Sequence, residues 1–454
     1  MGTTAETTAV PPARSRTWLA RWEPENEEFW RTQGRPLAWR TLTITTANLT
    51  MAFVVWFLVS ALVVRLPAIG FKFTTAQLFW LAAMPGLAGG TLRIVHTFLV
   101  PLYGTRNVVA FSTLSLLIPA VGLFFAVQNP ATPYWVLMAL AFLAGLGGGN
   151  FSSFMPSTSL FFPKRLQGTA LAIQAGIGNF GVSIVQFVTP WIIGFALFGA
   201  FAGESQILTT PSGQKPVWIQ NAAFIYVPFI AVFGVAAWFM LKSIPVRANF
   251  REQLDIFRLK HAFFMTTLYI MTFGSFAGFA ATFPLLIKTL YGHFPNAPDP
   301  LTYAFLGPLV GSVARVVAGP LSDRFGGAKV THWAGIGMLI CVIGATFFMA
   351  PKSLGEFWFF LAFMLGLFTF AGMGNASTFK QMPMLFAPRQ ASSIIGWTSA
   401  MAAYGPLAAG LMMGLSLELF GTPVAFFYWA AIYYAGNIAI NWALYARKGA
   451  EAPC

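Results

Sequence analysis

Acidic residues are nearly absent from the hydrophobic parts of this sequence. Of its 454 residues, 57% are hydrophobic and only 9% are charged. The 13 Asp and Glu residues lie at the termini, in polar loops or at the edges of apolar runs. Soluble domains carry roughly 25% charged residues, so this composition excludes an ordinary soluble protein. It also provides no intramembrane Asp or Glu relay of the kind that proton-driven systems often use.

Cysteine is scarce as well, because the chain contains only Cys341 and Cys454. Two cysteines cannot support a disulfide framework or a cysteine-rich metal site. The four histidines are scattered and form no H-E-x-x-H motif, and the chain has no Walker-type Gly-Lys-Ser/Thr. These absences argue against an enzyme, a metal centre, a bound cofactor and ATP-driven pumping. The N-terminal region also lacks the apolar core of a cleavable signal peptide.

Long apolar runs dominate what remains of the sequence. They recur from Thr41 to Ala446, and each is long enough to cross about 30 Å of hydrocarbon as a helix. We therefore expect an all-α polytopic membrane protein, embedded in the lipid bilayer. Twelve spans are expected, at residues 41–64, 74–100, 107–127, 134–161, 168–199, 218–241, 262–290, 301–321, 329–350, 355–386, 391–417 and 422–445.

The net charge of +14 follows the topology of these spans. With both termini in the cytoplasm, 19 of the 27 Lys and Arg residues fall on the cytoplasmic side, five fall on the opposite side and three lie within spans. An excess of Lys and Arg in cytoplasmic loops orients membrane helices. The positive charge is therefore explained by topology, and we expect no nucleic-acid partner.

The longest polar stretch between spans runs from Lys242 to His261 and separates two sets of six spans. Secondary transporters are often built from two such repeats. The expected organisation is a cytoplasmic N-terminal segment (1–40), an N-terminal six-helix bundle (41–241), a central cytoplasmic loop (242–261), a C-terminal six-helix bundle (262–446) and a cytoplasmic tail (447–454).

The two sets of spans resemble each other at one fixed offset. Asn150-Phe151-Ser152-Ser153-Phe154 in the fourth span aligns with Asn375-Ala376-Ser377-Thr378-Phe379 in the tenth when the sequence is shifted by 225 residues. The Pro-Lys and Pro-Arg pairs that end these two spans match at the same offset. Shared hydrophobicity does not explain a shared register of polar residues, so the pattern predicts two pseudo-symmetric bundles.

Two arginines occupy matched positions near the middle of the second and eighth spans. Arg93 lies eleven residues before Gly104, and Arg315 lies eleven residues before Gly326. A guanidinium group inside a bilayer is costly and usually faces a cavity or an ion path. Because the spans offer no carboxylate, the expected partner is an external anion, and the planar guanidinium fork suits a small planar oxyanion. The alternative is that each arginine only satisfies helix-end carbonyl groups.

Aromatic and amide side chains provide further candidates for the site. Phe151, Tyr269 and Phe273 occupy plausible inward positions, and Tyr269 and Phe273 share one helix face. A flat anion could lie between two phenyl rings, although most of the 48 Phe residues must serve as core or lipid-facing groups. An amide within hydrocarbon needs a partner, which is either structural or the anion. The embedded amides are Asn150, Asn179 and Asn375.

Two basic side chains leave alternatives open. Lys380, within the tenth span, either extends its charge to the interface or adds a third positive charge to the pathway. His96 follows Arg93 by three residues and lies on the same face. It is the best candidate for proton coupling, because histidine titrates near physiological pH, and otherwise it is a polar lining group.

These residues together resemble the nitrate/nitrite porter family of the major facilitator superfamily, over nearly the whole chain. The loop Gly319–Gly327 is similar to the G-x-x-x-D-R-x-G loop of the superfamily, and Gly176–Ser183 is similar to a signature of the porter family. The span-eleven counterpart, at Gly396–Ala400 and Tyr404, has fewer glycines than this family usually shows. Further matching segments are Trp22–Glu25, Phe124–Pro130, Gly149–Ser153, Thr272–Phe276 and Ser377–Phe379.

The resemblance implies a site and a function. Arg93 and Arg315 would grip nitrate or nitrite, Phe151 and Phe273 would sandwich the anion, and Tyr269 and Asn179 would lie nearby. It implies alternating access across a bacterial inner membrane, with no cofactor, and we expect a monomer. Nitrate/nitrite antiport is favoured, with proton–nitrate symport as the alternative. A passive anion channel would not need the repeat, and a membrane-embedded enzyme would need a catalytic cluster that the sequence lacks.

Overall fold

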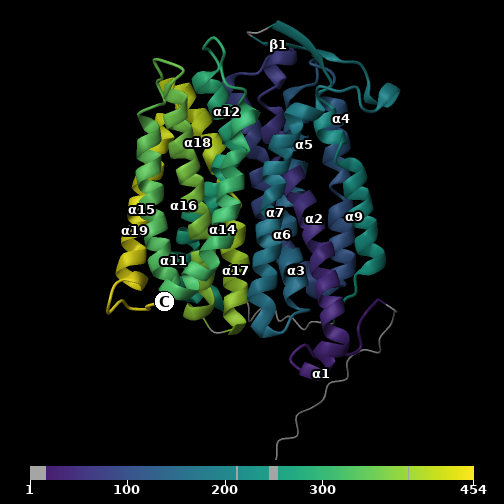
Figure 1. The fold of residues 1–454 in the computed structure, drawn as a ribbon, viewed down its shortest axis with the longest axis vertical. Coiled ribbons are helices and arrows are strands. Elements are labelled where there is room, and N and C mark those ends of the chain that lie inside the picture. Colours follow the sequence, from purple (N-terminus) through teal and green to yellow (C-terminus); the bar gives the residue numbers. More distant parts are fainter. Residues whose placement is uncertain (1–16, 211–212, 245–253, 387) are drawn as a thin grey trace, which may run out of the picture.

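The structure is a computed structural model that describes residues 17–210, 213–244, 254–386 and 388–454. Its helices run side by side along one axis, and the first half of the chain, coloured purple to teal, lies beside the second half, coloured green to yellow (Figure 1). The end that carries β1 is called the hairpin end here, and the opposite end, which carries α1 and the C-terminus, is called the terminal end.

The helices of the first half are long and, in places, interrupted. Several contain prolines, and helix geometry nevertheless persists because a backbone in lipid must satisfy its own hydrogen bonds. The elements are α1 (Glu27–Phe29), η1 (Trp30–Gly34), α2 (Arg35–Leu62), η2 (Leu66–Ile69), α3 (Thr75–Leu114), α4 (Leu117–Ala126), α5 (Tyr134–Ala144), α6 (Leu146–Ser159), α7 (Lys164–Ile192), η3 (Gly199–Ala202), α8 (Asn221–Phe224) and α9 (Val227–Met240).

The second half has the same character. Two π-helical turns, η5 and η6, are inserted in or appended to its helices. The elements are η4 (Leu254–Arg258), α11 (Lys260–Tyr269), η5 (Ile270–Gly274), α12 (Ser275–Tyr291), α13 (Pro300–Ala304), α14 (Leu306–Phe325), α15 (Gly327–Thr346), α16 (Glu356–Leu385), α17 (Pro388–Ala402), α18 (Gly405–Phe420), α19 (Val424–Asn441) and η6 (Trp442–Ala446).

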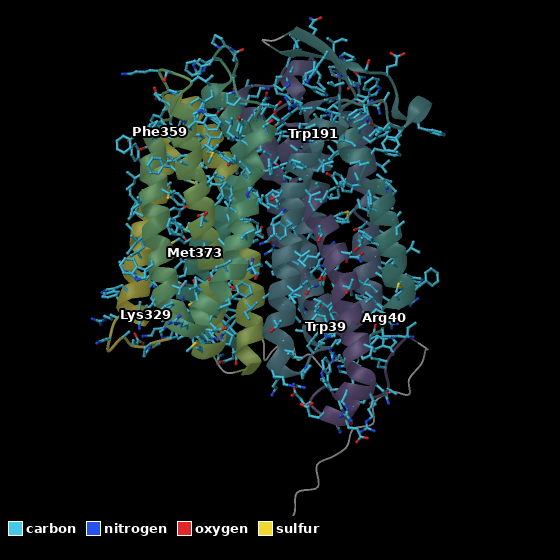
Figure 2. All side chains as sticks on the ribbon, in the orientation of Figure 1. Trp39, Arg40, Trp191, Lys329, Phe359 and Met373 are labelled. Carbon is cyan, nitrogen blue, oxygen red and sulfur yellow. The ribbon has the colours of Figure 1, made fainter. Side chains whose placement is uncertain are left out.

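The membrane-spanning character predicted from the sequence is confirmed. Among the described residues, 11 helical stretches are long and apolar enough to cross a bilayer. The expected twelfth span corresponds to α19 and η6, which are not among those 11 stretches. Exposed Trp191 and Phe359 lie toward the hairpin end, whereas exposed Trp39 lies toward the terminal end (Figure 2). Aromatic belts of this kind mark the two interfaces of a membrane protein.

The structure adds local detail at two places. The connection expected at residues 101–106 between the second and third spans is shorter than a loop, because the two helices that make up α3 meet directly at Gly104 (φ 77°). The predicted all-α membrane fold is confirmed, and the connection between α7 and α8 adds one short antiparallel hairpin of β1 (Gln206–Thr210) and β2 (Gly213–Val217), which contacts η2. Two five-residue strands that include Pro216 give too weak a periodic pattern to separate a hairpin from a loop in the sequence.

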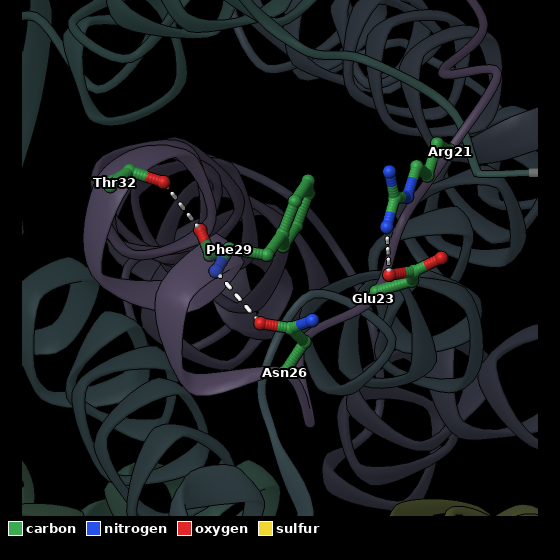
Figure 3. Close-up of polar contacts among 5 residues, drawn as sticks. All are labelled: Arg21, Glu23, Asn26, Phe29 and Thr32. Atoms are coloured by element: carbon green, nitrogen blue, oxygen red, sulfur yellow. Dashed lines mark hydrogen bonds and ion pairs between the residues drawn. The ribbon is translucent and has the colours of Figure 1, made fainter.

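The N-terminal segment Trp22–Trp30 leads directly into the first span. Asn26 caps α1 by accepting a hydrogen bond from the Phe29 N–H at 3.1 Å, and Thr32 donates to the Phe29 carbonyl oxygen (Figure 3). The helix then continues through η1 into α2 without a loop. The Trp22 indole N–H donates to the Leu160 carbonyl oxygen, which fastens this segment to the end of α6.

The two halves meet along the helix pairs α3–α18 and α7–α14. The helices of the first pair approach so closely that a Cβ atom at Gly410 would lie only 2.7 Å from the Phe79 carbonyl oxygen. Small residues permit this approach of two backbones in a membrane helix pair. Arg93 on α3 and Arg315 on α14 therefore belong to helices that form the boundary between the halves.

Candidate anion-binding site

Arg93 is the most deeply buried cation of the candidate site, with no exposed surface. Its Nε–H donates to the Gly148 carbonyl oxygen at 2.9 Å, and its Nη1 donates to the Ser399 carbonyl oxygen at 2.7 Å. Gly148 belongs to α6 of the same half, and Ser399 belongs to α17 of the other half. The Nη2 group of Arg93 has no hydrogen-bond partner in the described chain. Carbonyl groups thus fix the guanidinium through Nε and Nη1, and the Nη2 donor group remains free.

Three aromatic rings surround the Arg93 guanidinium. Its Cζ atom lies 4.6 Å from the ring centre of Phe151, 5.2 Å from that of Phe273 and 5.3 Å from that of Trp56. A cation over an aromatic face is attracted by the ring quadrupole. The structure therefore brings together the two phenylalanines expected to form the sandwich, and it places them beside Arg93.

Arg315 approaches the same region from α14. It is 8% exposed, and its Cζ lies 5.4 Å from the Phe379 ring centre. The Arg315 Nη1 group has no hydrogen-bond partner among the residues described. Arg315 and Arg93 lie close enough to repel each other electrostatically. No ion pair joins either arginine to a carboxylate in the described part of the chain, so the site holds two uncompensated positive charges.

Tyr269 and Phe273 are presented by the π-helical turn η5 and the residue before it. Their rings stack with centroids 5.5 Å apart and an angle of 5° between their planes. The buried Tyr269 hydroxyl group lies close to both Arg93 and Arg315, and its side-chain contact with Arg315 falls short of a well-formed hydrogen bond. A π-turn widens a helix locally and often occurs at functional sites. The hydroxyl is thus a further free donor close to both cations.

The three candidate amides fall into two groups. Asn179 on α7 and Asn375 on α16 are buried, and neither their amide nitrogen nor their amide oxygen has a hydrogen-bond partner within the described residues. Asn150 on α6 donates to the Ser112 carbonyl oxygen at 3.4 Å, which is a long hydrogen bond. Buried polar groups are normally satisfied, so Asn179 and Asn375 have capacity for a partner from outside the chain.

Lys380 and His96 lie in other surroundings. The Lys380 ammonium group pairs with an Asp323 carboxylate oxygen at 2.5 Å, near the C-terminal end of the helix α14. Its charge is therefore compensated locally and is not a third free cation beside Arg93 and Arg315. His96 is buried, and its Nδ1 is 2.9 Å from the Ser153 hydroxyl oxygen on α6.

Several participants were not identified from the sequence. The Ser399 carbonyl oxygen is a main-chain group, which every residue carries, so no side-chain pattern indicates it. Trp56 carries no distinguishing motif, whereas Phe379 lies in the repeated Ser-Thr-Phe segment that matches Phe154. The Tyr404 hydroxyl lies 2.8 Å from the Thr91 hydroxyl, so Tyr404 joins the two halves close to the site.

The donor set determines which ligand class fits this site. It offers guanidinium, hydroxyl and amide donors between aromatic faces, and no carboxylate. Among the described residues, no group of three or more His, Cys, Asp or Glu is placed to hold a metal ion. The arrangement suits a small, flat anion that accepts several hydrogen bonds. An apolar groove of about 490 Å³ between α14 and α16 contains none of these residues, so the groove is separate from the site.

Comparison with known proteins assigns the chain to a family. The model of the Major Facilitator Superfamily matches residues 44–379. The probable nitrate/nitrite antiporter NarK2 of Thermus thermophilus is 62% identical over 439 residues, which cover 96% of this chain and 98% of the relative. The chain belongs to the nitrate/nitrite porter family of the major facilitator superfamily.

Other members and one distant structure extend the comparison. The porter-family nitrate/nitrite transporter NarU of Salmonella typhimurium is 39% identical, over 96% of this chain and 97% of the relative. The crystal structure of a bacterial homologue of the human lysosomal transporter Spinster, in an inward-facing and occupied conformation, superposes with a TM-score of 0.65 and 14% identity. That alignment covers 90% of this chain and 96% of the other, and at this identity it shows the fold alone.

Proposed function

We propose that this porter-family chain exchanges nitrate for nitrite across a membrane by alternating access. The observation that carries the proposal is a pair of buried guanidinium groups, Arg93 and Arg315, each with a free donor and neither with a carboxylate partner among the described residues. Buried charges are normally paired. A monovalent anion bound between them would supply the missing partner.

Shape selection would come from two features of the same site. A guanidinium fork donates parallel hydrogen bonds in one plane, which matches the planar arrangement of oxygens in nitrate and nitrite. The rings of Phe151 and Phe273 flank Arg93 and leave little room for the out-of-plane oxygens of a tetrahedral anion. The free Tyr269 hydroxyl adds a donor toward one more oxygen.

Exchange follows from the energetics of the empty site. Two like charges at the boundary between the halves repel each other, and their burial is costly without a counterion. Closure around an empty site would bury both charges uncompensated, whereas closure around an anion would not. The loaded protein therefore switches readily and the empty protein does not, which produces obligatory exchange.

Proton–nitrate symport is the alternative. Its support is His96, which is buried three residues from Arg93 and shares a hydrogen bond with Ser153. The described part of the spans offers no carboxylate near His96 to relay a proton, so antiport is preferred.

The remaining features of the proposal concern context. The protein would be a monomer in a bacterial inner membrane, with both termini cytoplasmic and no catalytic activity. Residues 41–241 and 262–446 would form the two six-helix bundles that move relative to each other, joined by the central loop 242–261. Under this orientation the hairpin end faces outward.

Transport by the purified protein in liposomes tests the proposal. Liposomes loaded with nitrite would receive external labelled nitrate, and internal nitrite and the pH gradient would be varied independently. We expect uptake to require internal nitrite and to ignore the pH gradient. Uptake into nitrite-free liposomes that follows an inward proton gradient would instead establish symport.

Variants link this activity to the site. We expect Arg93→Gln combined with Arg315→Gln to abolish exchange. Arg40→Lys, a change at an exposed arginine of α2, is the matched control and should exchange at the wild-type rate. Undiminished exchange by the double variant would show that the anion does not bind between these arginines.

A further inference from the structure

Arg65 forms an ion pair across the boundary between the two halves. It lies just beyond the C-terminal end of α2, and its Nη2 is 2.5 Å from the Asp299 Oδ2. Asp299 precedes α13, and its Oδ1 caps that helix by accepting a hydrogen bond from the Leu301 N–H. The two partners are not equally buried, because the Arg65 side chain is 10% exposed and the Asp299 side chain is 39% exposed.

A second basic side chain, from the second half of the chain, contacts the first half across the same boundary. Lys288, near the C-terminal end of α12, donates a hydrogen bond from its ammonium group to the Val64 carbonyl oxygen. Lys288 interacts electrostatically with both Arg65 and Asp299. Two cations thus share one carboxylate, so this cluster retains an excess positive charge. The Arg65 Nε–H is buried and has no hydrogen-bond partner in the described chain.

Contacts deeper in the boundary show that this end of the protein is closed. The Gln186 amide group on α7 donates to the Ser60 hydroxyl oxygen at 3.1 Å and, across the boundary, to the Ala280 carbonyl oxygen at 2.8 Å. At the outer edge of the same boundary, the half-exposed Phe187 ring contacts the Phe305 ring, with centroids 4.9 Å apart. η2, directly after Arg65, contacts β1, so the cluster of Arg65, Lys288 and Asp299 lies at the hairpin end.

We propose that Arg65 and Lys288 form a second binding site for a small inorganic oxyanion at the hairpin-end mouth, which Asp299 occupies as an internal counterion when this end is closed. The inference rests on the proposed function, because it assigns this site to the anion that Arg93 and Arg315 carry. It adds a second place at which that anion binds.

The competition between Asp299 and the anion follows from how the halves separate. When the hairpin end opens, α2 carries Arg65 away from α13, and Lys288 leaves the Val64 carbonyl oxygen. A largely buried guanidinium that loses its carboxylate is strongly destabilised unless another anion replaces it. Asp299 is the more exposed partner, so water can solvate it after separation, whereas Arg65 recruits the anion. Excess positive charge at the mouth also attracts anions from solution.

Two substitutions distinguish an anion site from a simple latch. In liposomes with the hairpin end outside, we expect Arg65→Gln to raise the KM for external nitrate about tenfold, the change expected for one charge-assisted hydrogen bond. Asp299→Asn removes the competitor, so it should lower that KM. A simple latch predicts the opposite pattern, because both variants break the same ion pair and would shift the KM in the same direction. Shifts in the same direction would overturn the proposal.

Controls separate local binding from general damage. Arg65→Lys keeps the charge and should give a KM between those of the wild type and Arg65→Gln. Lys72→Gln removes an exposed charge at the hairpin end, and Glu356→Gln removes a charge whose hydrogen-bond donors, the Lys352 and Ser353 N–H groups, belong to its own half. Neither variant should change the KM. The KM for internal nitrite should stay constant in every variant. A parallel rise in the internal KM would show that Arg65 acts on the central site instead.

A second measurement does not depend on transport. In a chain with Cys341→Ser and Cys454→Ser, Ser60→Cys reports opening of the hairpin end through its reaction with an impermeant thiol reagent. We expect the external nitrate concentration that gives half of the change in reaction rate to rise with Arg65→Gln and fall with Asp299→Asn. Equal shifts, or none, would overturn the second site. If the wild-type protein fails to exchange nitrate for nitrite while the two variants still show these opposite shifts, the proposed function alone is rejected.

Discussion

Arg93 of α3 donates a hydrogen bond to the main-chain carbonyl oxygen of Ser399, which belongs to the other half of the chain, at 2.7 Å. Ser399 lies just before the interruption between α17 and α18 at Ala403 and Tyr404. The proposed anion-binding cation is therefore also a link between the halves. An anion that changes the position of the guanidinium would act directly on the backbone beside this interruption.

This link predicts that lysine cannot replace Arg93. Lysine keeps the positive charge, but its compact ammonium group cannot hold both the Gly148 and the Ser399 carbonyl oxygens and also present a planar donor edge to an anion. We expect Arg93→Lys to raise the KM for nitrate by more than about tenfold, since each hydrogen bond to a charged group contributes about 1.5–3 kcal/mol. Initial rates of nitrate/nitrite exchange in liposomes would measure the effect. A KM equal to that of the wild type would show that charge alone suffices.

The aromatic faces around Arg93 give a second prediction. The Phe151 ring lies 4.6 Å from the Arg93 Cζ, and a desolvated cation–π contact contributes about 2 kcal/mol. We expect Phe151→Leu to raise the KM for nitrate about tenfold. Phe154→Leu is the matched control, because Phe154 is equally buried on the same helix and forms none of the described cation–π contacts of Arg93. Both variants should lose similar thermal stability, and equal KM values would remove the ring from the site.

Much of the central site could be predicted from the sequence, for a physical reason. A charged residue in an apolar span is rare because it is costly, so Arg93 and Arg315 are conspicuous wherever they occur. The repeat then places them at matched depth, and the absence of acidic residues in the spans indicates that the ligand carries a negative charge. These arguments need only residue identity and spacing. The family membership inferred from the same motifs is confirmed by the comparisons.

The rest depends on contacts that spacing does not encode. Arg65 and Asp299 are ordinary loop-end residues until the fold brings them together from positions 234 residues apart. The π-turn at Ile270–Gly274 changes which side chains of that helix share a face, whereas a sequence pattern assumes a uniform period. The span bounds predict a connection at residues 101–106. In the structure the chain stays helical through Pro101, and the two helices meet only at Gly104.

Lys380 provides a third prediction that separates two roles. Its ion pair with Asp323 joins side chains that are 44% and 63% exposed, and such exposed pairs contribute only about 0–1 kcal/mol. We expect Lys380→Gln to change neither the KM for nitrate nor thermal stability by a measurable amount. Lys329→Gln, at an exposed lysine toward the same end (Figure 2), is the control for loss of a surface charge. A several-fold rise in KM for Lys380→Gln alone would place this lysine in the anion pathway.

The contact between Gly405 and Gly274 gives the last prediction. Gly405 begins α18 directly after the interruption in the eleventh span, and Gly274 ends the π-turn that carries Phe273. A Cβ atom at Gly405 would lie 2.0 Å from the Gly274 carbonyl oxygen. Because the obstacle is backbone, no side-chain rotation can relieve the overlap. Either α18 or the π-turn must move, and such overpacking typically costs about 1–3 kcal/mol or more.

We therefore expect Gly405→Ala to lower the temperature of half-unfolding in detergent and to weaken nitrate exchange, since displacement of the π-turn moves Phe273 away from Arg93. Gly436→Ala on α19 is the matched control, because a Cβ atom there meets nothing within 4 Å. Alanine at that helix position should be neutral or slightly stabilising. If Gly405→Ala unfolds at the wild-type temperature, the two helices do not pack through these glycines. If it is destabilised but retains the wild-type KM, the π-turn is not what positions Phe273 for the anion.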